Sequence, residues 1–223
     1  MKLLAVETAT EACSVALWLD GQVRETCNQQ PHGHARTLLP MIQSILDQAG
    51  VNLSELNAIA YGKGPGSFTG LRVGLGVVQG LALARKLPVI SVSSLASLAQ
   101  GQAGKNILAA LDARMGQVYW GAYQRRQNDR VELTGQEQVN LPTEIQAPGD
   151  VPWKGAGSGW DVYPDTLSQR IGERLISWEP QQFPRAIHTA TLAVAEYNLG
   201  RAVAAEYSSP EYIRNQVATQ PKK

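Results

Sequence analysis

A glycine-rich segment at residues 61–70, YGKGPGSFTG, carries the clearest candidate chemistry in the chain. It follows a short apolar strand that ends at Tyr61 and precedes a run with helical spacing, which predicts a strand, a tight loop and a helix start. The amides of Gly64, Gly66 and Ser67 could converge on an anion at the positive end of that helix. A close-packed turn without a ligand explains the same residues, so both interpretations stay open.

A second glycine-rich turn, WKGAGSGW at residues 153–160, makes Gly155 and Gly157 further candidates for nucleotide binding. The Walker A pattern is absent, because Lys63 is followed by Gly64 and not by Ser or Thr. A Gly-x-Gly sequence alone is weak evidence for a nucleotide. We therefore expect that the chain itself requires no cofactor.

Metal chemistry has little support in the sequence. His32 and His34 form an HxH pair, which binds metal when a third ligand arrives from elsewhere, but the only other histidine is the distant His188. We expect the pair to cap a helix or face solvent. Glu7 and Asp112 each end an apolar strand, and we interpret both as structural positions rather than magnesium ligands.

Composition narrows the function further. The 223 residues are 43% hydrophobic, which suits one large or two small globular domains. Lysine and arginine number 20 against 19 acidic residues, so no basic field would attract nucleic acid, and any tRNA should be held through a partner. The apolar run at residues 3–6 is too short for a signal peptide, and no transmembrane run is present. We expect a cytoplasmic protein.

The helix expected after the first glycine-rich loop is apolar on nearly all sides. Four internal glycines at about 1 kcal/mol each would cost it roughly 4 kcal/mol, which packing must offset. One face gathers small residues: Gly66, Gly70, Val73, Gly74, Gly76, Val77, Gly80 and Ala84. The other carries Phe68, Leu71, Arg72, Leu75, Val78 and Gln79. Such a helix must be buried on both sides, so we expect its own sheet on one side and a second chain on the other.

An amphipathic helix at residues 38–49 is the second candidate for docking. Its apolar positions are Leu38, Leu39, Ile42, Ile45, Leu46 and Ala49, and Gly50 supplies the stop. Pro40 is tolerable only if the helix begins near it. The predicted partner-binding residues of the two helices are Leu39, Ile42, Leu46, Phe68, Leu71, Arg72, Leu75 and Val78.

The first strands form a meander over residues 2–7, 13–19 and 22–29. A two-residue turn at Asp20 and Gly21 would pair Cys13 with Asn28. Cys27 then points away from Cys13, so no disulfide is expected, and each cysteine is interpreted as a small buried hydrophobe.

The chain also repeats itself. With a shift of 105 positions, residues 3–18 match residues 108–123 in pattern: an apolar strand, an acidic end, a turn and an alternating strand. This repeat predicts two halves with the same topology, residues 1–104 and residues 105–223. Further expected elements are strands at 58–61 and 86–92, a short helix at 93–100, a helix at 189–205 and an extended tail from residue 208.

Nearly the whole chain resembles the TsaB (YeaZ) family. The resemblance rests on MKLLAVETATEACSVAL, HxxxxLLPMI, GKGPGSFTGLRVGLGVVQGLA, PVISVSSL, DARMGQVYWGAY and PEYIRNQVA, in that order, with GPGSFTGLR the most specific. It implies an α/β fold of two duplicated subdomains, like those of actin, sugar kinases and heat-shock chaperones, with mixed sheets flanked by helices.

The resemblance also implies a function. TsaB is a bacterial non-catalytic partner of TsaD, acting with TsaE to make N6-threonylcarbamoyladenosine next to the anticodon of tRNAs that read codons beginning with A. It implies a homodimer when alone, and ATP or ADP as a possible ligand of the complex. The metal-binding HxxxH of TsaD-type enzymes is missing, since residues 92–98 are VSSLASL. A nucleotide-hydrolysing enzyme and, less favoured, a peptidase remain the alternatives.

Overall fold

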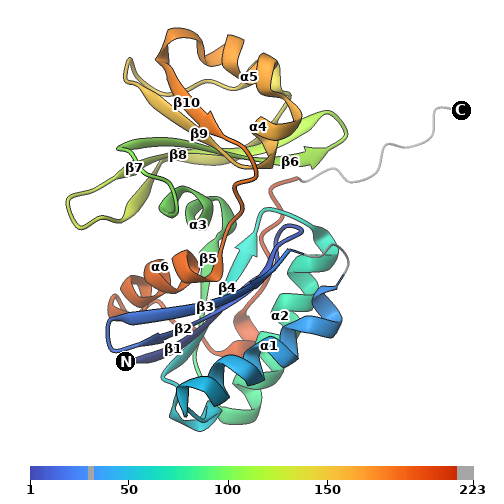
Figure 1. Cartoon of the computed structure of the whole chain (residues 1–223), viewed down its shortest axis with the longest axis vertical. Coiled ribbons are helices and arrows are strands. Elements are labelled where there is room, and N and C mark those ends of the chain that lie inside the picture. Colours follow the sequence, from blue (N-terminus) through green and yellow to red (C-terminus); the bar gives the residue numbers. More distant parts are fainter. Residues whose placement is uncertain (30–32, 215–223) are drawn as a thin grey trace, which may run out of the picture.

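The computed structural model describes residues 1–29 and 33–214, which form two lobes, each built on a five-stranded mixed sheet (Figure 1). The first sheet comprises β1 (Lys2–Glu7), β2 (Cys13–Leu19), β3 (Gln22–Asn28), β4 (Ala58–Gly64) and β5 (Val89–Ser93). The second comprises β6 (Asn106–Arg114), β7 (Gln117–Arg125), β8 (Val131–Asn140), β9 (Trp153–Ala156) and β10 (Leu175–Glu179).

The two sheets have one topology. Their strand orders are β3-β2-β1-β4-β5 and β8-β7-β6-β9-β10, so β6 holds the place of β1. In each sheet the first three strands in sequence are antiparallel and the next two run parallel to the central one. The predicted repeat is therefore confirmed, and the fold consists of duplicated actin-like subdomains.

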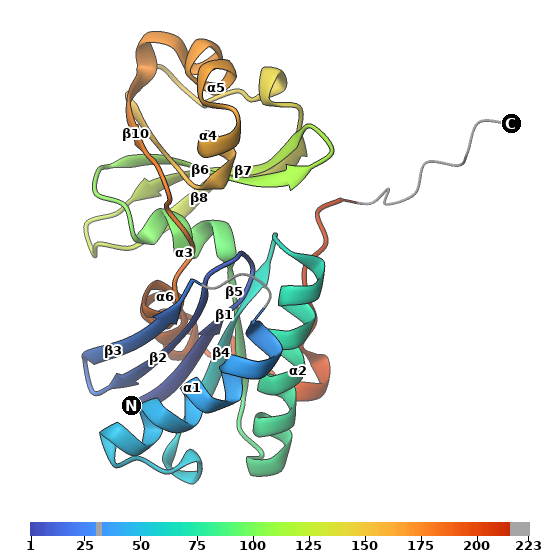
Figure 2. The same ribbon diagram turned by 45° about the vertical axis from the view of Figure 1, so that its right-hand side comes forward.

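Helices cover both sheets and fill the space between them (Figure 2). They are α1 (His34–Ala49), α2 (Phe68–Arg85), α3 (Ser94–Gln100), α4 (Ser158–Val162), α5 (Pro164–Ile171) and α6 (Ala186–Asn198). Short 3-10 helices lie at Leu53–Glu55, Pro142–Glu144, Gly172–Arg174 and Ala205–Tyr207. The last helix ends at Asn198, earlier than predicted, because a left-handed Gly200 follows it.

Three hydrophobic clusters hold these layers together. Alternation along β1 sends Leu4 and Val6 toward α1 and α2, and Leu3 and Ala5 toward α6 and the second lobe. A third cluster packs α4 and α5 on the outer face of the second sheet. The apolar core thus runs continuously through the junction between the lobes.

The two helices between the sheets, α3 and α6, each pack on the sheet of the other half of the chain. Helix α3 follows β5 of the first sheet but packs on β6, β7 and β8, whereas α6 follows β10 and packs on the first sheet. The boundary proposed between residues 104 and 105 falls between the two sheets, and each half supplies an inner helix to the sheet of the other half.

Two local predictions are wrong. Helix α1 begins at His34, so Pro40 lies inside the helix and not near its start. Pro40 has no amide hydrogen to donate to the Arg36 carbonyl, but both residues lie on the exposed side of the helix, where water can satisfy that carbonyl. Cys27 is exposed, although it lies on the same face of β3 as the core-packed Val23, because it is near the end of this edge strand. The predicted register of Cys13 opposite Asn28 is confirmed, and both cysteines are free.

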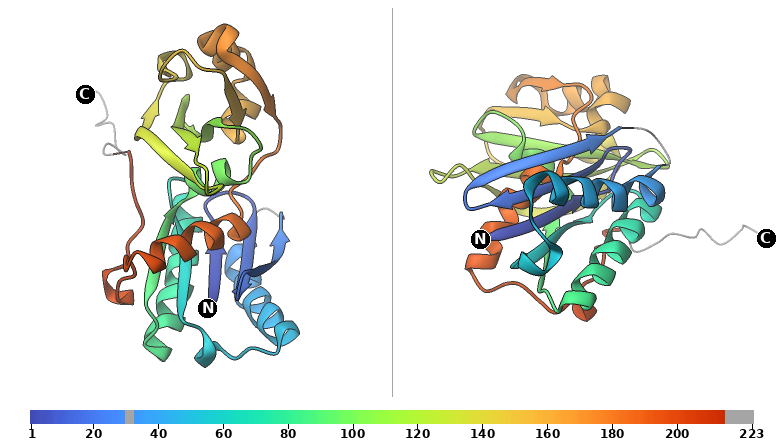
Figure 3. Two further views of the ribbon diagram at one scale, coloured as in Figure 1. Left: turned by 90° about the vertical axis from the view of Figure 1, so that its left-hand side faces the viewer. Right: turned by 60° about the horizontal axis from the view of Figure 1, so that its bottom comes forward.

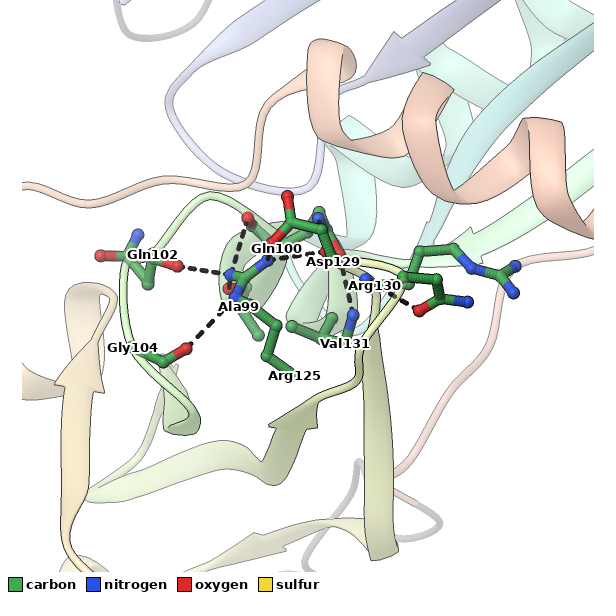
Figure 4. A network of polar contacts seen from close by, with 9 residues as sticks. Ala99, Gln100, Gln102, Gly104, Arg125, Asp129, Arg130 and Val131 are labelled. Carbon is green, nitrogen blue, oxygen red and sulfur yellow. Dashed lines mark hydrogen bonds and ion pairs between the residues drawn. The ribbon is translucent and has the colours of Figure 1, made fainter.

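Arg125 fastens α3 to the second lobe (Figure 4). Its guanidinium donates to backbone carbonyls at the end of α3 and in the turn after β7: Ala99, Gln100, Gln102, Gly104 and Asp129. The positive charge lies at the C-terminal end of the helix dipole, which is favourable. The Gln100 side chain donates to the Asp129 carbonyl at 2.8 Å and accepts from the Val131 amide at 2.9 Å.

We expect Arg125→Ala to lower the free energy of unfolding by about 2–4 kcal/mol, because it leaves several carbonyls without their donor. Arg126→Ala is the matched control, since Arg126 pairs with Glu132 in solvent and should contribute about 0.5 kcal/mol or less. Urea unfolding of both variants measures this, and equal losses would contradict the structural role of Arg125.

Candidate functional site

Glu7 lies at the junction of the lobes with an exposed fraction of 0%. Its Oε1 accepts hydrogen bonds from the amides of Thr8 and Ala9, both at 3.0 Å. Ser94 Oγ at the start of α3 lies 3.1 and 3.2 Å from the two carboxylate oxygens, and Thr189 Oγ1 of α6 donates to Oε2 at 3.4 Å. The carboxylate therefore joins β1 to both inner helices.

Burial raises the pKa of Glu7 from about 4.5 to about 7, and the amide and hydroxyl donors offset only part of that rise. No described lysine, arginine or histidine forms an ion pair with it. A Cβ on Gly62 would lie 2.1 Å from Glu7 Oε2, so the space beside the carboxylate is filled by backbone. The hydrogen-bonding capacity of the buried Glu7 carboxylate is thus taken up by groups of the same chain.

The first glycine-rich loop is also closed by the chain. Ser67 caps α2 by accepting from the Gly70 amide at 3.2 Å, and its own amide donates to the Ala9 carbonyl at 2.7 Å. A Cβ on Gly66 would lie 2.2 Å from that carbonyl oxygen. The Ser67 amide is therefore not free for an anion, and the close-packed turn describes this loop.

The second loop packs just as tightly. Cβ atoms on Gly155 and Gly157 would lie 2.4 Å from the Trp160 ring and 2.3 Å from the Ala110 carbonyl oxygen. Trp160 Nε1 donates to the Leu108 carbonyl at 3.1 Å, which fixes the ring in this position. The glycines are needed for close approach to β6, and this packing does not support the nucleotide hypothesis.

Asp112, the counterpart of Glu7, has a different environment. It accepts from the Arg114 amide at 2.9 Å and pairs with the Arg114 guanidinium at 3.1 Å. Arg114 also lies 3.7 Å from Glu11 of the first lobe. Asp112 therefore lies within β6, where the pairing with β7 shifts register, and the expectation that it ends the strand is wrong because β6 continues to Arg114.

The predicted docking residues divide into two groups. Five of them lie in the core of this chain, each with 7% exposure or less: Ile42, Leu46, Leu71, Leu75 and Val78. The expectation that they face a partner is wrong, because the large side chains of both helices cover the first sheet. Leu39, Phe68 and Arg72 are exposed.

The opposite side of α2 is open. Cβ atoms on Gly76 and Gly80 would meet nothing within 4 Å. The exposed or half-buried residues around them define the outer face of α2: Thr69, Val73, Gly76, Val77, Gly80, Leu83 and Ala84. Helices α1 and α2 lie side by side on the first sheet, and the exposed Leu39 and Pro40 belong to the adjacent helix (Figure 2).

Gly70 and Gly74 serve a different purpose from those outer glycines. Cβ atoms there would lie 2.2 Å from the Thr8 carbonyl oxygen and 2.2 Å from Thr8 Oγ1, and Thr8 Oγ1 donates to the Gly70 carbonyl at 2.9 Å. Gly70 and Gly74 therefore allow the turn after β1 of the same chain to pack against α2. At Gly76 and Gly80, by contrast, an added Cβ would meet no described atom.

Residues 208–214, within the predicted extended tail, contact both lobes (Figure 3). We call this segment the C-terminal strap. On the first lobe, Tyr212 accepts from Arg72 Nε at 3.1 Å and its ring lies 5.7 Å from that of Phe68. On the second, Arg214 donates to the Ala113 carbonyl at 3.0 Å and to Gln117 at 2.7 Å.

The two described histidines, His34 and His188, lie in separate environments. His32 lies outside the described residues, and His34 Nε2 contacts the Thr10 carbonyl at 2.7 Å. Burial, with Arg185 adding to the effect, lowers the pKa of His188 to about 4. Within residues 1–29 and 33–214 no three histidine, cysteine or acidic side chains are grouped as metal ligands, and the expected absence of a metal stays a prediction. No described helix is long and apolar enough to cross a membrane.

Comparison with known proteins identifies the family. The family model for TsaD, tRNA N6-adenosine threonylcarbamoyltransferase, matches residues 28–220. The tRNA threonylcarbamoyladenosine biosynthesis protein TsaB of Escherichia coli (strain K12) is 44% identical over 98% of this chain and 96% of its own. The Haemophilus influenzae TsaB is 36% identical, with 97% and 95% covered. This chain belongs to the TsaB (YeaZ) branch of the TsaD family.

Solved structures agree. YeaZ from Pseudomonas aeruginosa is 44% identical and superposes with a TM-score of 0.88 over 95% of this chain and 99% of its own. A second structure from that organism, described as similar to peptidase YEAZ, is 43% identical with a TM-score of 0.89 over 96% and 99% of the two chains.

The Glu7 carboxyl makes stability depend on pH in a defined direction. The folded chain holds this proton more tightly than the unfolded chain, so its stabilisation is complete below pH 4.5 and is lost as pH rises through about 7. Relative to Glu7→Gln, the wild type should lose roughly 3 kcal/mol of unfolding free energy across that range.

Denaturant unfolding between pH 4.5 and 8 tests this, with Glu11→Gln as the control because Glu11 is half exposed and should follow the wild type. Parallel stability curves for the wild type and Glu7→Gln would show that Glu7 does not titrate in this range.

Proposed function

We propose that this protein is a non-catalytic subunit that binds TsaD and holds it in a working conformation for threonylcarbamoylation of tRNA adenosine. The observation that carries the proposal is the outer face of α2, where Cβ atoms on Gly76 and Gly80 would meet no described atom within 4 Å. The names of its relatives supply the biosynthetic role.

The energetics of α2 favour a docking role. Each glycine inside a helix costs about 1 kcal/mol relative to alanine, and Gly70 and Gly74 offset that cost by admitting Thr8. Gly76 and Gly80 have no such contact within the described residues. A partner helix that approaches the α2 backbone closely would account for them, since small residues allow that approach.

The internal polar groups support an accessory role. Glu7 is sealed by its own donors, and the amide of Ser67 is bound to Ala9. Gly155 and Gly157 are packed against Trp160 and β6. We infer that catalysis belongs to TsaD, that TsaE joins the same complex, and that tRNA is held through these partners in the cytoplasm. Any ATP or ADP would then act in the complex.

Two enzyme alternatives have less support. A nucleotide-hydrolysing enzyme would need an open phosphate site at the glycine-rich loops, whose Ser67 amide and glycine faces already contact the chain itself. A peptidase would need a nucleophile or a metal, and no group of three metal-type ligands occurs among the described residues. Turnover of nucleotide by the pure protein would favour the first alternative.

We expect the isolated protein to cover the outer face of α2 by pairing with itself, because unpartnered apolar surface favours self-association. Sedimentation at micromolar concentration should show a dimer that Gly80→Arg converts to monomer. Gln169→Arg, on the exposed surface of the second lobe, is the control and should remain dimeric. A wild type that stays monomeric would count against a docking face on α2.

The functional test uses Gly76→Arg. The buried Leu75 is unsuitable, because a charge there would disrupt the core of this chain. A Cβ at position 76 would meet no described atom within 4 Å, so arginine can be introduced there without a clash at Cβ. Arginine also improves helix propensity, but its side chain would obstruct a closely packed partner. We expect binding to TsaD to weaken about 10- to 100-fold.

The assay is reconstitution with TsaD, TsaE, threonylcarbamoyl-adenylate and unmodified tRNA, with threonylcarbamoyladenosine as the readout. Gln169→Arg should behave as the wild type. If folded Gly76→Arg protein fails to bind TsaD and yet supports full modification, the scaffold proposal fails. If the wild type modifies tRNA without TsaD, the protein is itself an enzyme.

A further inference from the structure

A cavity of about 640 Å³ opens between the lobes, away from the outer face of α2. Its walls come from β5, α3, β7, β8, α6 and the C-terminal strap. This volume is in the usual range for pockets that bind small molecules, roughly 300–1,000 Å³. Of the two glycine-rich turns, only Lys63 lines the cavity, so the cavity is distinct from the nucleotide site considered at those turns.

The polar centre of the cavity is Glu137 of β8. Tyr123 OH and Ser93 Oγ both donate to its Oε1. The Ser93 oxygen accepts from the Ala96 amide at 3.1 Å, which directs the hydroxyl proton toward Glu137. Tyr123 is only 1% exposed, so its ring is fixed by packing. Two residues from two different lobes therefore hold one carboxylate oxygen in place.

The other oxygen of Glu137 has no protein donor. Within the described residues, no side chain or amide bonds to Oε2, and no cation pairs with the carboxylate. Lys63 lines the same cavity, but it is engaged by Glu211 at 2.5 Å. Burial raises the pKa of Glu137 and Glu211 adds to that rise, while the hydroxyls of Ser93 and Tyr123 and the charge of Lys63 offset only part of it.

Much of the remaining wall is apolar, beside the polar Ser91 and Gln136. The apolar side chains are those of Val92, Ala96, Val131, Leu133, Leu192 and Ile213. The third carboxylate, Glu196, is paired with Arg201 at 2.8 Å. The cavity thus combines one carboxylate that has no ion pair among the described residues with an apolar surface, which suits a ligand that has a charged end and an apolar body.

We propose that this cavity binds an organic cation, a primary amine or an amidine on an apolar body, with the charged group on Glu137. A charge-assisted hydrogen bond to Oε2 would satisfy the free acceptor and supply the counter-ion, while the apolar body covers the wall formed by β8 and α6. The same group could come from a free small molecule or from the side chain of an arginine in another protein.

The test is titration of the full chain with benzamidine and tryptamine, followed by NMR and calorimetry. Their neutral counterparts are benzamide and tryptophol, and N-acetylarginine amide represents a protein side chain. The cations should perturb the signals of the cavity residues and bind at least about tenfold more tightly than the neutral compounds. Tighter binding of the arginine amide than of benzamidine assigns the site to a protein side chain.

Three variants sharpen the result. Glu137→Gln should lose about tenfold or more in affinity for the cations, whereas Glu132→Gln, on the same strand but paired with Arg126 outside the cavity, should not. Ala96→Leu should block binding by filling the cavity while Glu137 stays intact. Absence of binding by every cation, or equal binding of benzamidine and benzamide, overturns the proposal.

Discussion

The rest of the structure depends on the close approach of Thr8 to Gly70 and Gly74. Atoms of Thr8 occupy the positions that side chains on these two glycines would fill, and the Thr8 hydroxyl donates to the Gly70 carbonyl. This contact fixes the rotation of α2 about its axis. It places Leu71, Leu75 and Val78 on the first sheet and leaves Gly76 and Gly80 on the outside.

The same contact determines the hydrogen bonds of the first glycine-rich loop. Once the turn after β1 lies on the start of α2, the Ala9 carbonyl accepts from the Ser67 amide and Glu7 collects the amides of Thr8 and Ala9. The buried carboxylate then reaches Ser94 and joins the inner helix of the second lobe. The close packing of the loop and the engaged Ser67 amide are therefore two consequences of one arrangement.

Sequence reasoning succeeded where one periodicity decides the outcome. The alternation of β2 and β3 around Asp20 and Gly21 predicted the correct register, and the shift of 105 positions predicted the matching sheets. It failed on α2 because both faces are apolar, so the pattern cannot say which one covers the sheet. Only the space at Gly70 and Gly74 decides between them.

Other features depend on contacts between distant residues. Tyr212 meets Arg72 across 140 positions, and Glu137 meets Ser93 across 44, in segments without a periodic pattern that would bring them together. The exchange of α3 and α6 between the sheets has the same cause, because a helix pattern shows an apolar face and not the sheet that it covers. Such contacts follow from the tertiary fold alone.

The outer face of α2 is the surface that we propose meets TsaD. Hydrogen–deuterium exchange of this chain, alone and in the presence of TsaD, tests that claim most directly, with the isolated chain held at a concentration where it is monomeric. We predict slower exchange in α1 and in residues 69–84, with α5 and β10 unchanged. Protection confined to the second lobe, with α2 unaffected, would contradict the account.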